Sequence, residues 1–266
     1  MIIRNPKGQL LKSNYTTPQQ FRQDVRDNLW NTPTTGVMDS YVQANVVILP
    51  EIYAQDFVNF CEANSKPCPL LEVLEPGIPW TSKIADRADI RTDVPAYKIY
   101  SKGVLSRETN DISSIWRDDL VTFFLGCSFS FEYALQEENI PVKHQDLGTN
   151  VPMFITNIQT VPSNLFSGPM VVSMRPIPDN LVDKSVEITS RFPDNHGAPI
   201  HIGSPASLGI SDLQNPDYGD PVPIANGETP VFWACGVTPQ AVALTARPEL
   251  MITHSPGHMF VTDMKL

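Results

Sequence analysis

The sequence predicts an α/β protein, with a layered main domain on a mixed sheet and a smaller inserted α+β subdomain. Its 266 residues suit one large domain that carries a smaller one. Val231–Cys235 is a short apolar run of β-formers, and a helical stretch over 241–246 follows within a few residues. Residues 123–190 predict helix, strand, strand, helix between Gly- and Pro-marked borders. The main domain is then 1–122 plus 191–266, with both halves in one sheet.

The first half of the chain predicts two helices, a strand, a strand pair and a third helix. Thr17 is a typical N-cap with Pro18 at the first helical position, and Pro50 opens the second helix. A strand is expected over Cys68–Leu74 and a strand pair over Ala96–Arg107. The third helix, Asp111–Leu125, is expected from its apolar residues at 112, 115, 116, 120, 123 and 124.

The second half predicts the elements of the insert and the C-terminal strand and helix. Small polar residues before Phe131–Glu137 favour a helix start there. β-Branched residues predict strands over Met153–Thr160 and Met170–Met174, and Leu181–Phe192 is a helix candidate. The strand Val231–Cys235 is bounded by turn residues, so it is expected to be buried.

Composition and charge limit the partners of the chain. The formal net charge is −10 and the pI is about 4.9, which argues against nucleic acid as a partner, because that ligand needs a basic face. No run approaches 18 apolar residues, so no membrane span is expected. The opening MIIRNPKGQL lacks the basic and apolar regions of a secretory signal.

The four cysteines indicate a reducing compartment. Cys61, Cys68, Cys127 and Cys235 form no CxxC pair, so they are expected to be reduced thiols in the cytoplasm and not a zinc site. No P-loop, GxGxxG, GxSxG or HExxH pattern is present.

The corner between Val231–Cys235 and the following helix is the first candidate site. Thr238 suits the helix N-cap, and the amides after Gly236 lie at the positive end of the helix, which favours an anion. Cys235 would lie at the same place. An ordinary strand–helix corner with a structural cysteine explains the pattern equally well.

Two arginines are candidates for a substrate carboxylate, because guanidinium binds carboxylates through two parallel hydrogen bonds. Arg91 lies in the polar stretch ADRADIRTDVP, which is otherwise a solvated loop, and Arg175 leaves a predicted strand just before Pro176. Cys127 and Glu132, at the predicted helix start of the insert, are candidates for proton transfer. The alternative for these two is a helix cap and an exposed acid.

Histidines are the likeliest general bases, since an unperturbed imidazole has a pKa of about 6.5. His196 and His201 lie five positions apart on opposite faces of an extended segment, so they are a poor metal pair. His254 and His258 flank a Ser-Pro-Gly turn that prevents the helix which HxxxH metal binding needs. His254 is expected in a strand that lies parallel and adjacent to Val231–Cys235, so that the carboxyl ends of the two strands meet. We therefore predict one pocket that contains Cys235, Thr238, His254 and His201, with an arginine for the substrate carboxylate.

Several strings, in order along the chain, resemble the D-glutamate cyclase family, whose bacterial members carry the name hydro-lyase. The resemblance extends from about Gly36 to Asp263 and implies a two-part α/β architecture with an inserted domain. Larger relatives, which have an extra domain, carry the cyclase activity. The strings are YVQANVVILP, PCPLLEV, ADIRTDVPAYKIY, GCSFSFE, VVSMRP, HGAPIHIG, GDPVP, FWACGVTPQ and ITHSPGHMFVTD.

Two functions follow. The first is a hydro-lyase that removes water from a small amino or hydroxy acid by general acid/base catalysis without cofactor or metal, with D-glutamate to 5-oxo-D-proline as the named candidate. The second is a non-catalytic protein that binds a small carboxylate or a partner on the same fold. No nucleic-acid or membrane partner is expected, and a homodimer is compatible with either function.

Overall fold

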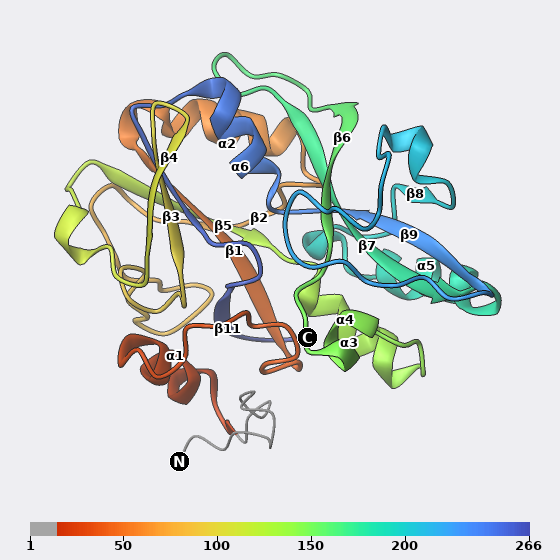
Figure 1. Ribbon diagram of the computed structural model, residues 1–266. Helices are drawn as coiled ribbons and strands as arrows, with labels where there is room; N and C mark the ends of the chain where they lie inside the picture. The colour runs from red at the N-terminus through yellow and green to blue at the C-terminus, as the bar shows by residue number, and fades with distance from the viewer. Residues whose placement is uncertain (1–14) are drawn as a thin grey trace.

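The computed structural model describes residues 15–266 and contains two antiparallel sheets, each covered by helices. The sheets lie side by side (Figure 1), the larger on the left of the view and the smaller on the right. The predicted α/β class is therefore confirmed. The prediction of a mixed sheet is wrong, because every strand pair among residues 15–266 is antiparallel. The prediction that no secretory signal is present concerns residues 1–14, which lie outside the described part of the chain.

The larger sheet has the strand order β2-β5-β1-β10-β3-β4, and β11 pairs with β1 beyond the end of β10. The predicted strand pair is confirmed as the β3–β4 hairpin. The strands of this sheet are β1 Tyr41–Pro50, β2 Leu70–Val73, β3 Tyr97–Ser101, β4 Val104–Thr109, β5 Leu120–Gly126, β10 Leu250–His254 and β11 Phe260–Lys265.

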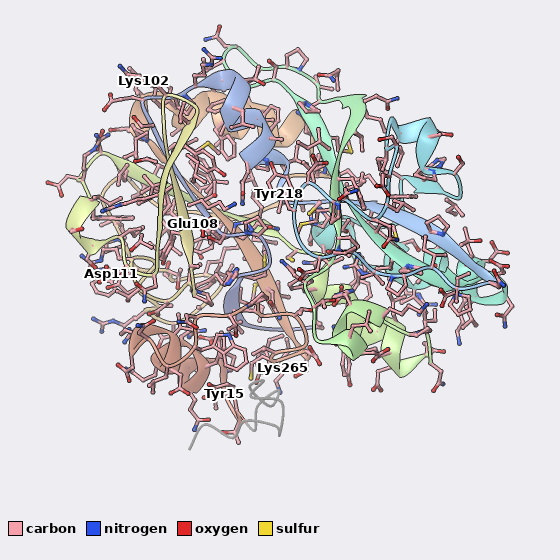
Figure 2. All side chains as sticks on the ribbon, in the orientation of Figure 1. Tyr15, Lys102, Glu108, Asp111, Tyr218 and Lys265 are labelled. Carbon is pink, nitrogen blue, oxygen red and sulfur yellow. The ribbon has the colours of Figure 1, made fainter. Side chains whose placement is uncertain are left out.

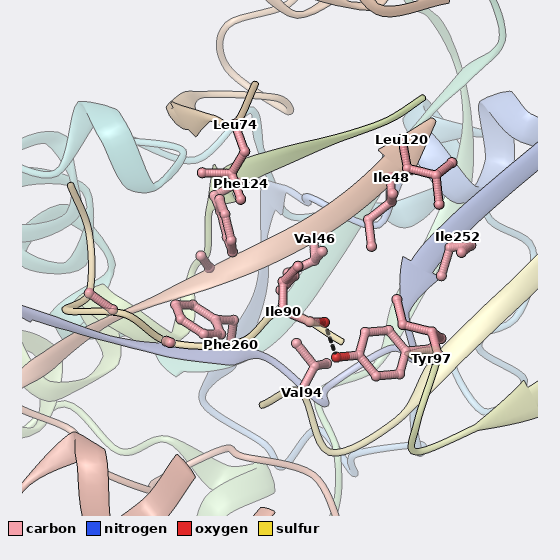
Figure 3. Packing of buried hydrophobic residues seen from close by; sticks show 14 of the residues in the cluster. Val46, Ile48, Leu74, Ile90, Val94, Tyr97, Leu120, Phe124, Ile252 and Phe260 are labelled. Carbon is pink, nitrogen blue, oxygen red and sulfur yellow. Dashed lines mark hydrogen bonds between the residues drawn. The ribbon is translucent and has the colours of Figure 1, made fainter. Parts of the chain in front are cut away.

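Both faces of the larger sheet are buried, because alternate residues of its central strands point to opposite sides. On one face, Val46 and Ile48 pack under the loop that follows β2 (Figure 3), where the Tyr97 hydroxyl donates to the carbonyl oxygen of Ile90. On the other face, Val47 and Leu49 pack against α2 (Ala54–Ala63) and α6 (Thr238–Ala246). β1 is consequently buried along almost its whole length.

The smaller sheet has the order β6-β7-β9-β8. α3 and α5 cover one of its faces through an apolar cluster that includes Phe131 and Trp233. The elements of this half are α3 Phe129–Glu137, α4 Lys143–Leu147, β6 Met153–Gln159, β7 Pro169–Pro178, α5 Val182–Ser190, β8 His201–Ile202 and β9 Glu228–Ala234.

The remaining elements are one helix and five single-turn 3₁₀ segments. α1 (Pro18–Arg26) begins as predicted, because the Thr17 side chain accepts a hydrogen bond from the backbone N–H of Gln20. The short segments are Glu51–Tyr53, Ser113–Ile115, Asp179–Leu181, Pro193–Asn195 and Pro205–Leu208. Among residues 15–266, every helix is too short or too polar to cross a membrane.

Three predictions about the elements are wrong. Residues 111–125 do not form one α-helix. They contain only the 3₁₀ turn Ser113–Ile115 before the strand β5, since a short apolar run fits either structure and pairing with β1 decides it. The halves that flank 123–190 do not share one sheet, because β9 pairs with β7. β9 and β10 lie in different sheets, so they are not neighbouring parallel strands.

Candidate functional site

The carboxyl ends of three strands meet at Asn45, near the start of β1. Gly126, the last residue of β5, pairs with Ala44, and β10 ends at His254 on the other side of β1. β9 ends at Ala234, and Gly236 just after it lies against the Asn45 side chain. The two sheets therefore touch where their strands end, although no parallel β-α-β unit brings them together.

Asn45 connects these strand ends through its side chain. Its Nδ2 donates a 2.6 Å hydrogen bond to the carbonyl oxygen of Gly126, and a Cβ atom on Gly236 would lie 2.0 Å from the same nitrogen. Asn45 is 2% exposed. We call Asn45, Cys127, Cys235, Gly236 and His254 the junction cluster; four of these five are sequence-predicted site residues.

The two cysteines of the junction cluster follow the same pattern, one at each strand–helix corner. The backbone N–H of Phe129 lies 3.4 Å from Cys127 Sγ and donates to it, and Val237 donates to the thiol of Cys235. Both thiols pack in the apolar cluster between the sheets. Burial raises the pKa of Cys127 well above its ordinary value and that of Cys235 to about 11, so both thiols are protonated at neutral pH.

Thr238 does not cap α6 as predicted. Val237 occupies the N-cap position, and the Thr238 hydroxyl donates to the carbonyl oxygen of Cys235 at 2.6 Å. The same hydroxyl accepts the backbone N–H of Val171 at 3.1 Å. Thr238 therefore fixes the corner after β9 to the start of β7, and its oxygen is already engaged.

Glu132 and Arg175 lie beside the junction cluster and bind each other. Arg175 donates to Glu132 from Nε at 2.9 Å and from Nη2, and also to the hydroxyls of Ser128 and Ser173. Gln145 donates to the second carboxylate oxygen at 2.6 Å. Neither charge is exposed, so this is an internal ion pair, not the exposed acid or the open carboxylate clamp that the sequence suggested.

The surroundings of Glu132 keep it ionised. Burial alone would raise its pKa, but the interactions with the neighbouring His144 and Arg175 lower it to about 2. His144 Nε2 lies 3.2 Å from the same carboxylate.

Arg91 and His201 lie away from the junction cluster. Arg91 binds Asp89 through Nε and Nη2 at 2.9 and 2.8 Å, with its guanidinium over the ring of Trp80. His201 lies on the outer strand β8 opposite Phe232, and its Nε2 contacts the carbonyl oxygen of Ser204. The predicted single pocket therefore lacks these two residues.

His254 fills a gap in the strand pairing of β1. β10 pairs with β1 at Val47 and β11 pairs with it from Ala44, so the backbone of Val46 is left between them. His254 Nδ1 lies 3.1 Å from the backbone nitrogen of Val46 and 3.3 Å from its carbonyl oxygen. The shorter contact, in which the Val46 N–H donates to Nδ1, places the ring proton on Nε2. That Nε2 is buried and has no hydrogen-bond partner among residues 15–266. Burial lowers the pKa of His254 to about 4, so the ring is neutral at pH 7.

The sequence missed a lysine at this edge of the larger sheet. Lys98, on β3 opposite Thr253, contributes to the charge around His254, and its Nζ lies 5.9 Å from the ring of Tyr218. Its ion pair with Glu108 is loose at 3.4 Å. Figure 2 shows Tyr218 at the boundary between the two sheets and Glu108 on the β3–β4 side. In the sequence, only the alternation of Lys98 and Tyr100 with apolar residues pointed to this face.

The side chain of Gln240 links α6 to two strands of the larger sheet near Lys98. Gln240 of α6 donates to the carbonyl oxygen of His254 at 2.8 Å and accepts from Tyr100 at 3.3 Å. Burial, together with the neighbouring Asp217 and Cys235, raises the pKa of Tyr218 to about 12. Within residues 15–266, no group of three or more His, Cys, Asp or Glu side chains is arranged to hold a metal ion. Activity without a bound metal ion stays a prediction.

Comparison with known proteins identifies close relatives. A family model described as D-glutamate cyclase matches residues 121–263, which is more than half of the chain. A "Putative hydro-lyase" of Thermoanaerobacter pseudethanolicus is 58% identical over 256 residues, covering 96% of this chain and 97% of the relative. Relatives of the same description in Geobacillus kaustophilus (55% identical over 93% of this chain and 94% of theirs) and Bacillus subtilis (54%, over 93% and 96%) also match.

Among solved structures, a nitrogen repressor-like protein from Methanococcus jannaschii aligns with 86% of this chain and 88% of its own at 10% identity. Its TM-score is 0.36, which is too low to support a conclusion about fold or function. The sequence relatives do support a conclusion about the family, because they match along nearly the whole chain at 54–58% identity. The chain therefore belongs to the D-glutamate cyclase family.

Proposed function

We propose that this protein is a hydro-lyase that removes water from a small amino or hydroxy acid at the junction cluster. D-Glutamate, converted to 5-oxo-D-proline and water, is the first candidate substrate. One observation carries the proposal: a neutral, buried His254 presents an Nε2–H with no partner among the described residues, near a partly exposed lysine. Family membership supports the same reaction class.

Lys98 is the proposed anchor for the substrate carboxylate. Its side chain is 18% exposed, whereas its partner Glu108 is 54% exposed. An exposed ion pair of this kind contributes little to stability, about 0–1 kcal/mol, so an incoming carboxylate can replace Glu108 at small cost. Arg175 and Arg91, the cations expected from the sequence, already bind carboxylates within the protein.

His254 is the proposed electrophile. Loss of water from a carboxyl or hydroxyl carbon places negative charge on oxygen in the transition state, and a donor held at that point stabilises it. A neutral imidazole in a buried site can supply such a hydrogen bond without giving up its proton. His254 is therefore not proposed as the general base that the sequence predicted, because Nδ1 already accepts the Val46 N–H and Nε2 carries the ring proton, which leaves no free lone pair.

The first test is a substrate screen with a charge variant. Purified full-length protein is incubated with D-glutamate, L-glutamate and 2-hydroxyglutarate, and mass spectrometry measures products that are lighter by one water. Lys98→Met should lower kcat/KM by about 10²-fold or more, through loss of binding and positioning. Lys102→Met, at the turn of the same hairpin, is the matched control and should keep full activity. Absence of any dehydrated product, or equal activity of the two variants, argues against the proposal.

A second test separates the two nitrogens of His254. In His254→Asn, the amide oxygen can accept the Val46 N–H in place of Nδ1, while the Nε2–H is lost. We expect kcat to fall about 10²–10³-fold, the usual effect of removing one donor to a developing oxyanion, with little change in KM. An unchanged kcat in a folded variant would show that His254 only closes the strand gap.

A binding protein without turnover is the second candidate. It is favoured by the internal use of groups that the sequence offered for catalysis: Glu132 and Arg175 bind each other, and both thiols are protonated. Calorimetric binding of D-glutamate that Lys98→Met weakens, with no change in ligand mass after long incubation, would support this candidate over the enzyme.

A further inference from the structure

His196 is held in an unusual backbone conformation. It follows the 3₁₀ turn Pro193–Asn195, and its φ of 78° lies in the left-handed region. A residue other than glycine adopts this region at a cost, and such strain is often found at functional sites. The side chain is 1% exposed. An unfavourable backbone conformation is therefore tolerated at a position where the imidazole lies in the interior.

The hydrogen bonding of His196 leaves one nitrogen as an acceptor. Nδ1 lies 2.8 Å from the carbonyl oxygen of Lys66. A carbonyl oxygen can only accept, so the ring proton is on Nδ1 and Nε2 carries a lone pair. Nε2 has no hydrogen-bond partner among residues 15–266. Burial lowers the pKa of the ring to about 4, so it is neutral at pH 7.

His196 lies next to a second unsatisfied side chain. Asn195 is buried, and its Nδ2 has no hydrogen-bond partner in the described part of the chain. That Nδ2 lies 3.1 Å from the place of a Cβ atom on Gly126, whose carbonyl oxygen binds Asn45. Asn195 therefore brings an unused donor to the end of β5, which lies on the side of β1 away from β10 and His254, and the next residue, His196, carries an unused acceptor in the interior.

A buried polar group without a partner costs about 1–3 kcal/mol, so two together require an occupant that supplies both an acceptor and a donor. Water satisfies that requirement, and so does a substrate hydroxyl, ammonium or protonated carboxyl group. The tautomers of His196 and His254 are opposite: one ring offers a lone pair, the other an N–H, on either side of β1. This is the division of roles that removal of water needs.

We propose that His196 is the proton acceptor of the reaction and that Asn195 holds the group that carries the proton. This inference rests on the proposed function. For D-glutamate, Nε2 takes a proton from the α-ammonium as nitrogen bonds to the side-chain carboxyl carbon. It returns that proton to the carboxyl oxygen as the carbon–oxygen bond breaks. The second ammonium proton ends on the same oxygen, so one water leaves and the ring is regenerated.

The matched variant is His196→Asn. Asparagine tolerates the left-handed region, and its Nδ2 can donate to Lys66 as the ring Nδ1 does, but nothing replaces Nε2. We expect kcat/KM to fall at least 10²-fold. In the wild type, kcat/KM should decrease toward low pH as the ring becomes protonated, and the residual activity of the variant should lack this decrease. Full turnover in a folded His196→Asn protein overturns the proposal.

Nitrogen NMR of ¹⁵N-histidine-labelled wild-type protein provides a readout that needs neither turnover nor the variant. The expected result is the Nδ1–H tautomer at pH 7 for His196, with an Nε2 signal that shifts when D-glutamate or 5-oxoproline is added to saturation. An Nε2 signal that stays fixed while calorimetry shows the ligand bound would mean that only water occupies the site, and overturns the proposal.

The two experiments separate this inference from the proposed function. If the wild type dehydrates none of the substrates, the proposed function fails, and with it the assignment of His196 as proton acceptor. If turnover is found and Lys98→Met abolishes it, but His196→Asn does not reduce it, the proposed function stands and this inference alone fails.

Discussion

The side-chain amide of Asn45 donates to the carbonyl oxygen of Gly126 while the same nitrogen lies against Gly236. Asn45 therefore couples the last residue of a strand in the larger sheet to the first turn after a strand in the smaller sheet. Its position is held from both sides, so the strand–helix corner after β9 has no room for a larger residue.

Gly236→Ala tests this contact. The new Cβ would lie 2.0 Å from Asn45 Nδ2, which cannot retreat without breaking its hydrogen bond to Gly126. We expect the free energy of unfolding in urea to fall by about 1–3 kcal/mol, as in other overpacked interiors. Gly168→Ala is the control, because its nearest neighbour, Val242, would be 3.3 Å away. Equal effects of the two substitutions would contradict the account.

The ion pair of Glu132 predicts loss of stability in acid. The folded pKa of about 2 lies below the ordinary 4.5, so the folded state prefers the ionised form. This stabilisation, about 3 kcal/mol from the shift, is fully present above pH 4.5 and decreases as pH falls toward 2. Glu132→Gln should destabilise the protein strongly at pH 7, by about 3–5 kcal/mol, since it leaves Arg175 unpaired. Urea unfolding across this pH range should show the difference between variant and wild type shrinking in acid.

Two buried histidines predict a second loss of folding stability, which begins at a higher pH than the loss caused by Glu132. The folded pKa values of His196 and His254 are about 4, below the ordinary 6.5, so the unfolded chain binds more protons between these values. Stability should therefore be complete above pH 6.5 and fall as pH drops toward 4, by about 3 kcal/mol for each ring. His196→Asn and His254→Asn should each remove part of this slope in urea unfolding. A slope that both variants leave unchanged would refute the assignment.

The thiols of the junction cluster should react slowly. Alkylation requires the thiolate, and burial raises the pKa of Cys235 to about 11 and that of Cys127 still higher. At pH 8, iodoacetamide should modify both cysteines at least ~10²-fold more slowly in the folded protein than in urea. Peptide mass spectrometry gives the rate at each position. Rapid, selective labelling of folded Cys235 would instead indicate an activated nucleophile.

Local signals determined much of the chain correctly. Thr17 and Pro18 mark the start of α1, and the turn at Lys102-Gly103 marks the β3–β4 hairpin, because capping and turn residues act over a few positions. The run before Cys235 was recognised as a strand, and two of the predicted site residues, Cys127 and Cys235, pack in one apolar cluster. Residue type and spacing suffice for such features.

Tertiary structure decided the rest. Pairing with β1 makes 120–126 a strand, and pairing with β7 places β9 in the smaller sheet, since strand partners distant in sequence leave no local pattern. Arg175 and Glu132 are buried and bind each other, and both thiols are buried and protonated, so none of these groups is available to a substrate. His196 lies in the interior, whereas His201 lies on the edge strand β8. The sequence determined which groups could carry charge or protons; only the packed structure, through desolvation and hydrogen bonding, decided which of them remain unpaired.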